Sequence, residues 1–138
     1  MSSFKVFDIA GSALSAQSVR MNTLASNLAN ANTVSGEKDK VYRPRYPVFE
    51  AVGEQSARPG EAGAAVRVTD VIESEKAPLA RYEPGNPLAD AEGYVYAPDI
   101  NAVEQMVDMI AASRSYQNNI EVMNASKEML LATLRLGQ

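Results

Sequence analysis

The last quarter of the chain constrains the fold most, because residues 99–136 contain neither proline nor glycine. Large apolar residues recur in this segment at steps of three and four, which is the period of an amphipathic helix. At ~1.5 Å per residue, a helix over residues 101–136 is roughly 54 Å long, whereas a compact domain of this size is roughly 37 Å across. Such a helix overhangs any globule that the chain can build. Its apolar stripe comprises Met106, Met109, Ile110, Tyr116, Ile120, Met123, Leu130, Leu131 and Leu134.

Both ends of this helix are marked in the sequence. Pro98 blocks a helix upstream, and Asn101 precedes Glu104 by three residues, the spacing of a capping box. Gly137 is a typical helix stop. We therefore expect one uninterrupted helix between these signals.

The N-terminal segment, residues 3–32, predicts a second long helix. Apolar residues recur there at heptad spacing, and Gln17 on the same seam is a polar group that can fix register. Alanine and serine fill much of the remainder and allow another helix to approach closely. The fold class is therefore mainly α, with long N- and C-terminal helices packed as an elongated coiled-coil-like domain. The seam includes Phe7, Leu14, Met21, Leu24 and Leu28.

The middle of the chain, residues 33–98, predicts a small β-hairpin and irregular structure. Residues 41–52 and 64–73 alternate between apolar and polar side chains, as strands do. A hairpin of two strands is marginal in water, so it must pack on the helices or on another subunit. We expect residues 53–63 to form its open loop, residues 33–40 to form a solvated connector, and residues 94–96 to add a short strand.

These patterns divide the chain into two parts. Residues 1–32 and 99–138 form a helical core domain for polymerisation, and residues 33–98 form a small β-rich and irregular outer segment.

Composition argues against an enzyme. The 138 residues include no cysteine and no histidine, which removes thiolate metal ligands and the commonest general base. No glycine-rich phosphate loop or dinucleotide fingerprint is present. The carboxylates of Glu73 and Glu75 are an ordinary exposed pair. We expect no catalytic residue, no cofactor and no metal site.

Charge and hydropathy restrict the partners and the location. The net charge of −4 argues against nucleic acid or an anionic membrane surface as a partner. No apolar run approaches the ~20 residues that span a bilayer, so we expect no membrane insertion. Asp8, Gly11 and several polar residues interrupt any signal-peptide core after Lys5. This pattern predicts a cytosolic protein or one exported with its N-terminus intact.

Two functions remain open from the residue pattern. In the first, the stripe of the C-terminal helix packs between molecules, because that helix is the longer one and the polar middle cannot cover the excess. In the alternative, the chain is a soluble two-helix adaptor that presents its hairpin to a protein partner.

Two sequence motifs favour the first function. The run Ala25-Ser26-Asn27-Leu28-Ala29-Asn30-Ala31-Asn32-Thr33 resembles the N-terminal signature of bacterial flagellar axial proteins, the rod and hook family. The run from Asn101 to Ile110, continued by Ser113-Arg114-Ser115-Tyr116 and by Leu134-Arg135-Leu136-Gly137, resembles the C-terminal signature of that family. The motif residues carried over are Asn27, Leu28, Ala29, Asn30 and Thr33.

The resemblance implies a structural subunit of the periplasmic rod of the flagellar basal body. It implies a homo-oligomer that also contacts other rod proteins, with the terminal helices of many subunits packed into concentric layers of a hollow shaft. It further implies passage through the flagellar export apparatus without cleavage of a signal peptide. In this interpretation the apolar stripes of both helices are subunit-packing residues.

Overall fold

The computed structural model describes residues 3–53 and 64–137, with side chains from Lys5 onward. Most of the predicted loop at residues 53–63 lies outside the described residues. The elements in chain order are α1 (Ser3–Asn30), a 3₁₀ turn η1 (Lys38–Lys40), β1 (Arg45–Val52), β2 (Ala65–Glu73), β3 (Leu79–Tyr82), β4 (Tyr94–Ala97) and α2 (Ala102–Leu136). The prediction of a mainly helical chain with two long terminal helices is confirmed.

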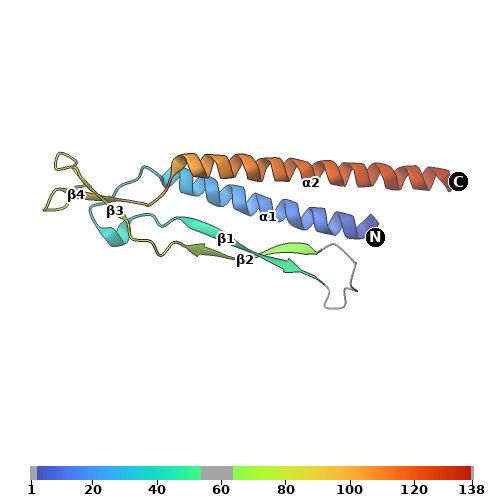
Figure 1. Cartoon of the computed structure of the whole chain (residues 1–138), viewed down its shortest axis with the longest axis horizontal. Coiled ribbons are helices and arrows are strands. Elements are labelled where there is room, and N and C mark those ends of the chain that lie inside the picture. Colours follow the sequence, from blue (N-terminus) through green and yellow to red (C-terminus); the bar gives the residue numbers. More distant parts are fainter. Residues whose placement is uncertain (1–2, 54–63, 138) are drawn as a thin grey trace.

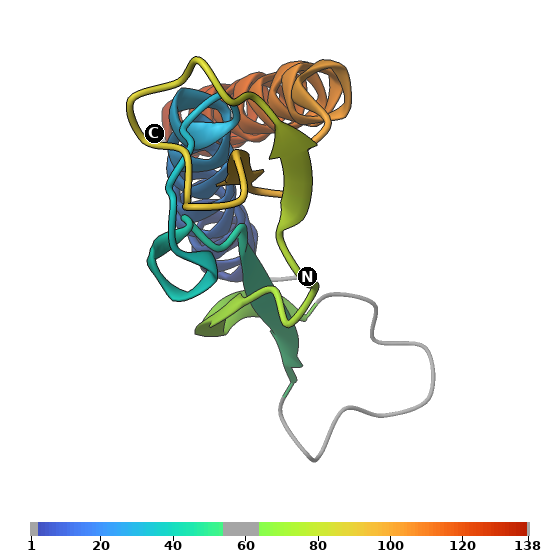
Figure 2. The same ribbon diagram turned by 90° about the vertical axis from the view of Figure 1, so that its left-hand side faces the viewer.

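The two helices lie side by side and antiparallel, and α2 extends past the beginning of α1 (Figure 1). With 28 residues in α1 and 35 in α2, α2 is roughly 52 Å long at the standard helical rise. α1 lies between α2 on one side and the β1–β2 hairpin on the other (Figure 2). The chain exposes 9721 Å², whereas a compact monomer of its mass would expose roughly 7000 Å². The molecule is therefore elongated.

α2 begins where the sequence predicts. The Asn101 side-chain oxygen accepts hydrogen bonds from the backbone amides of Val103, at 3.0 Å, and Glu104, at 3.4 Å. Among the described residues, the Glu104 carboxylate accepts no hydrogen bond from the Asn101 backbone amide, so only half of the predicted capping box is present. Two first-turn amides are nevertheless satisfied, and this fixes the start of the helix.

The hairpin predicted in the middle of the chain is β1 paired with β2. The antiparallel register runs from Arg45 opposite Glu73 to Val52 opposite Ala65, and it shifts between Val48 and Phe49. Such an irregularity increases the local twist, and the two strands cross in Figure 1. The backbone amide of Val66 donates to the Ser12 hydroxyl on α1 at 3.1 Å. The hairpin thus packs on α1, which is one of the two supports expected for it, the helices or another subunit.

A second two-stranded sheet, β3 with β4, closes the end of the molecule remote from both termini. The short strand predicted at residues 94–96 is β4, and its partner β3 was not predicted. Ser35, in the connector after α1, pairs with Tyr96 through two backbone hydrogen bonds of 2.9 and 2.8 Å. A Cβ on Gly36 would overlap the Leu88 carbonyl oxygen, so only glycine allows this close approach.

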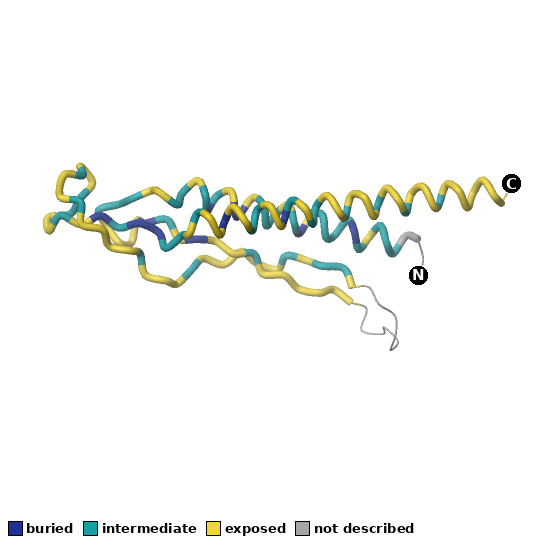
Figure 3. The backbone as a smooth tube through the Cα atoms, turned by 45° about the horizontal axis from the view of Figure 1, so that its top comes forward, coloured by how far each residue is buried: buried dark blue, intermediate teal, exposed yellow. Residues whose placement is uncertain are grey.

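The core is narrow and consists mostly of small side chains. It runs along the contact between α1 and α2 and continues around β4, as the dark segments in Figure 3 show. The buried hydrophobic residues are Ala10, Ala16, Leu24, Val41, Val95, Ala97 and Ala112.

Candidate functional site

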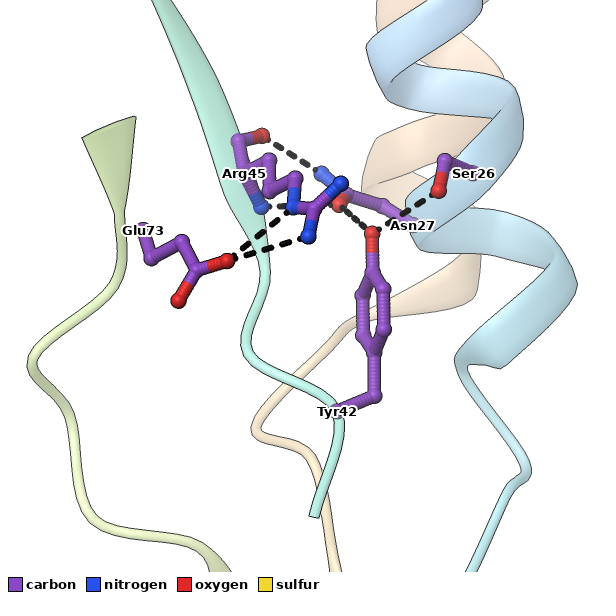
Figure 4. Close-up of polar contacts among 5 residues, drawn as sticks. All are labelled: Ser26, Asn27, Tyr42, Arg45 and Glu73. Atoms are coloured by element: carbon purple, nitrogen blue, oxygen red, sulfur yellow. Dashed lines mark hydrogen bonds and ion pairs between the residues drawn. The ribbon is translucent and has the colours of Figure 1, made fainter. Parts of the chain in front are cut away.

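Asn27, on the last turns of α1, joins three parts of the molecule through its side-chain amide. Its Nδ2 donates to the Arg45 carbonyl oxygen at 2.9 Å and to Gln105 Oε1 on α2 at 3.1 Å. Its Oδ1 accepts from the Arg45 backbone amide and from the Tyr42 hydroxyl, both at 2.9 Å (Figure 4). Asn27 is 0% exposed, and all four of its hydrogen-bonding positions are used. We call Asn27 and these partners the polar hub.

The hub substitutes for a missing strand. Arg45 opens β1, and the outer edge of a two-stranded sheet leaves backbone groups without a partner. The Asn27 amide pairs with both the N–H and the C=O of Arg45, as a neighbouring strand would. Gln105 adds a bond to α2, so a single side chain fixes the hairpin and both helices relative to one another.

Two further contacts support the hub. Tyr42 donates to Asn27, so its oxygen accepts the hydrogen bond that links it to the Ser26 hydroxyl at 3.0 Å. The Arg45 guanidinium pairs with Glu73 across the hairpin at 3.1 Å, with both side chains half exposed. That ion pair contributes little stability because water screens it. The free energy of the site therefore resides in the buried amide.

Sequence reasoning found part of this site. Asn27 was identified from the family motif, and its partners Tyr42, Arg45 and Gln105 were not. Asn27 binds Arg45 through the Arg45 backbone and binds Gln105 through the Gln105 side-chain amide. A hydropathy pattern marks neither a backbone group nor a single side-chain amide as a partner. The one signal in the sequence was Gln105 itself, a polar residue directly before Met106, the first position of the stripe.

A second polar cluster stabilises the turn between β3 and β4. Asp90 accepts from the backbone amides of Tyr94, at 2.8 Å, and Glu92, at 3.0 Å, and from the Tyr96 hydroxyl at 3.0 Å. The hydrogen bond from the Tyr94 backbone N–H is the main cause that lowers the pKa of Asp90. The same carboxylate, through its hydrogen bond, raises the pKa of Tyr96.

The face of α2 that meets α1 follows heptad spacing. Its less exposed positions recur at steps of four and three, and large residues alternate with small or polar ones. Four residues of the predicted stripe lie on this seam: Met109, Tyr116, Met123 and Leu130. The other four positions of the seam are Gln105, Ala112, Asn119 and Ser126.

The remaining residues of the predicted α2 stripe lie on an adjacent, uncovered face. These are Met106, Ile110, Ile120, Leu131 and Leu134, which are 38 to 61% exposed. Beyond residue 130 every described position of α2 is exposed, where the helix passes the end of α1 (Figure 3). The single stripe expected from the sequence is thus two neighbouring stripes, of which one faces α1.

The predicted stripe of α1 lies within the molecule. Leu24 is buried, and Phe7, Leu14, Met21 and Leu28 are half-buried. This helix is covered on two sides, by α2 and by the hairpin.

The other motif residues stabilise the end of α1. The Asn30 amide donates to the Ser26 carbonyl at 2.9 Å, and the Thr33 hydroxyl donates to the Asn30 carbonyl at 2.8 Å. Ala29 is exposed.

The Gln17 side-chain oxygen is buried without a hydrogen-bond partner among the described residues.

Within the described ranges, no helix combines the length and hydrophobicity needed to cross a bilayer. The same ranges contain no cluster of three or more His, Cys, Asp or Glu residues placed to bind a metal ion.

Two families match the ends of the chain. The family described as flagella basal body rod protein matches residues 7–36, which include most of α1 and the beginning of the connector. The family described as flagellar basal body rod FlgEFG protein C-terminal matches residues 91–136, which include β4 and α2. Both matches define a structural protein of the flagellar basal-body rod.

Relatives match over the full length. The flagellar basal-body rod proteins FlgC of Escherichia coli O157:H7 and of Salmonella typhimurium are each 53% identical over 138 residues, covering 100% of both chains. FlgC of Bacillus subtilis is 36% identical, again over 100% of both chains. The chain therefore belongs to the FlgC family of flagellar basal-body rod proteins. It is a structural subunit of the rod, not an enzyme, and it assembles with other rod proteins.

Proposed function

We propose that α1 and α2 pack as a coiled-coil-like pair that forms the polymerisation domain, residues 1–32 and 99–138. Residues 33–98 form the outer segment that contacts neighbouring subunits. The heptad spacing of the covered positions on α2 supports this proposal, because steps of four and three keep one seam facing a partner helix. The alternation of large and small residues on that seam gives α1 room to approach.

The uncovered apolar face of α2 is the observation that carries the proposal. Met106, Ile110, Ile120, Leu131 and Leu134 lie on a helix whose adjacent seam packs against α1. Burying each large apolar side chain contributes ~1.5 to 3 kcal/mol before the costs of ordering and association. Repeated in many subunits, this contribution stabilises a rod.

The predicted subunit-packing residues divide into two roles in this proposal. The five uncovered residues on α2 contact neighbouring subunits directly. Met109, Tyr116, Met123 and Leu130 hold α1 against α2, and so do the apolar residues of the α1 stripe. Asn27 and the rest of the motif set the angle of the hairpin to the helix pair.

Partners and location extend the proposal. The subunit contacts further copies of itself and other rod proteins along the periplasmic shaft. It reaches the periplasm through the flagellar export apparatus with no cleaved signal peptide. Asp8 and Gly11, which interrupt the apolar N-terminal segment, support that route.

Fractionation tests the proposal. Detergent-resistant basal bodies are purified from the native organism and compared with the soluble cytosolic fraction by mass spectrometry. We expect the chain to be enriched in basal bodies and expect truncation after Asp99 to abolish this. A full-length chain that stays in the cytosol contradicts the proposal.

A dilution series separates the rod subunit from an adaptor whose helices pair only within one chain. We expect low helicity in dilute solution and an increase with concentration, because residues 131–137 have no covering partner in one chain. Full helicity independent of concentration, with a cooperative thermal transition in the monomer, would support the adaptor. Circular dichroism at 222 nm measures the difference.

A further inference from the structure

We propose that Ser12 is a positioning residue that, together with Asn27, holds the β1–β2 hairpin on α1 at one fixed angle. Asn27 binds the beginning of β1 at Arg45, and Ser12 binds the beginning of β2 at Val66. Ser12 lies outside the motif at residues 25–33. The inference rests on the proposed function, in which the outer segment contacts neighbouring subunits and its angle to the helices matters.

The Ser12 hydroxyl is oriented by its own helix. It donates to the Ile9 carbonyl oxygen at 2.8 Å, so its proton is used within α1. Its oxygen accepts from the Val66 backbone amide at 3.1 Å. Ser12 and Val66 are both half-buried, where an amide left without a partner costs more than it does in water.

The two contacts lie on opposite edges of the hairpin. The Pro44 carbonyl, one residue before β1, accepts from the backbone amide of the residue that follows β2, at 2.7 Å. Antiparallel pairs alternate between bonded and non-bonded, so the backbone of the next residue, Arg45, is directed away from β2 and toward Asn27. The Val66 amide, which Ser12 accepts, is directed away from β1. α1 therefore crosses the hairpin diagonally, from the edge of β1 to the edge of β2.

The spacing of the two contacts is nearly the same on the helix and on the hairpin. Ser12 and Asn27 are 15 residues apart, which is roughly 22 Å along α1. Val66 is paired with Ala51, six residues after Arg45, and six residues of strand span roughly 20 Å. Both contacts form together when the hairpin runs along α1, as it does in Figure 1.

A single contact would not define an angle. With the polar hub alone, the hairpin can pivot about Arg45, and a displacement of one helical turn, ~5.4 Å, at its far end turns it by roughly 15°. Ala16 lies one turn from Ser12 toward the hub on the same helix face. It is buried and has no hydrogen-bonding side chain, so it offers no second docking position there. The Ser12 hydroxyl therefore selects one angle.

Hydrogen exchange at single amides tests the role of the hydroxyl, at a protein concentration at which the native chain is fully helical. Ser12→Ala should accelerate exchange of the Val66 amide about fivefold, the factor that corresponds to one typical hydrogen bond, and leave the Arg45 amide unchanged. Ser12→Thr keeps the hydroxyl and should restore the native rate. Ser18→Ala, an exposed change on the same helix, should have no effect. Equal acceleration at both amides, no acceleration at Val66, or no rescue by threonine overturns the proposal.

Disulfide trapping tests whether this contact persists in the rod, because the chain has no cysteine of its own. Through the hydrogen bond between them, the Cα atoms of Ser12 and Val66 lie no more than ~7 Å apart, which is within reach of a disulfide. Basal bodies that contain Ser12→Cys with Val66→Cys are treated with a mild oxidant. We expect a disulfide within each chain, detected by mass spectrometry of unreduced peptides. Ser18→Cys with Val66→Cys is the matched control, since Ser18 is exposed and lies roughly 9 Å further along α1.

The possible results separate this contact from the proposed function. A double variant that enters basal bodies and forms no internal disulfide overturns the proposal, and so does a control pair that forms one equally well. If the double variant does not enter basal bodies, the exchange rate of the Val66 amide decides. Absence of the native chain from basal bodies would instead refute the proposed function.

Discussion

Replacing Asn27 with alanine removes the centre of the polar hub. The substitution deletes four hydrogen bonds, two to the Arg45 backbone and one each to Tyr42 and Gln105. Because Asn27 is fully buried, water cannot reach its place without a rearrangement of the helices and the hairpin.

The expected cost follows from these contacts. A typical hydrogen bond contributes about 1 kcal/mol net, so four bonds correspond to about 4 kcal/mol. Alanine is the better helix former by about 0.5 kcal/mol, and a local rearrangement lets water solvate part of the released Arg45 backbone. We therefore expect Asn27→Ala to lower the free energy of unfolding by about 3 kcal/mol.

Urea unfolding followed by far-ultraviolet circular dichroism measures this loss. All variants are compared at one protein concentration, chosen high enough that the native chain is fully helical, since association also affects stability. For a slope near 1.5 kcal/mol per molar urea, the loss shifts the midpoint by about 2 M. Tyr42→Phe removes one donor to Asn27 and should shift it by only about 0.7 M. That variant keeps the test informative if Asn27→Ala is unfolded in water.

Asn22→Ala is the matched control. Asn22 is exposed on the same helix, and its replacement should change stability by no more than about 0.5 kcal/mol, in the stabilising direction. If the Asn27→Ala midpoint lies within about 0.3 M of the native value, the hub does not hold the hairpin to the helices and our reasoning is wrong.

Three further predictions follow from the helix face, the connector and the turn. Ile120→Asp should block assembly and leave secretion largely intact, because it places a charge on the uncovered face of α2; a motile strain with this change would refute the packing role. Gly36→Ala should lower the thermal midpoint, because its Cβ would overlap the Leu88 carbonyl oxygen, while Gly85→Ala, with open space around it, should not. The Tyr94 backbone amide holds the folded-state pKa of Asp90 below the ordinary value of an aspartate, so the contribution of Asp90 to stability is present above that ordinary value and is lost as the pH falls through the folded pKa. Acid titration of the native chain should show this loss, and Asp90→Asn should remove that part of the pH dependence.

The sequence predicted the helices well because their signals are local. The cap at Asn101 and the absence of breakers in residues 102–136 act within a few residues of the positions they control. The hairpin was predicted for the same reason, since alternation is visible along each strand. β3 was missed because it has four residues between prolines, and only its pairing with β4 makes it a strand.

The division of the α2 stripe could not be predicted from hydropathy. The sequence marks large apolar residues, and these occupy two adjacent lines on the helix. Ala112 and Ser126 are among the positions that face α1, and they are small where Ile120 and Leu134 on the open face are large. Which of the two rows of α2 residues is covered depends on how closely α1 approaches α2. That distance is set by the side chains of both helices together.

The size difference between the two faces of α2 has an energetic consequence. Apolar burial contributes in proportion to the area removed from water, and the seam toward α1 gives half of its positions to small or polar residues such as Ala112 and Asn119. The open face carries Ile110, Ile120 and Leu134, whose apolar area remains in water in the single chain. Covering that face therefore removes further apolar area from water, beyond what pairing of the helices removes. We therefore expect the helix pair to be only modestly stable alone and to gain stability when other subunits cover it. This matches the requirements of a subunit that folds fully only in its assembly.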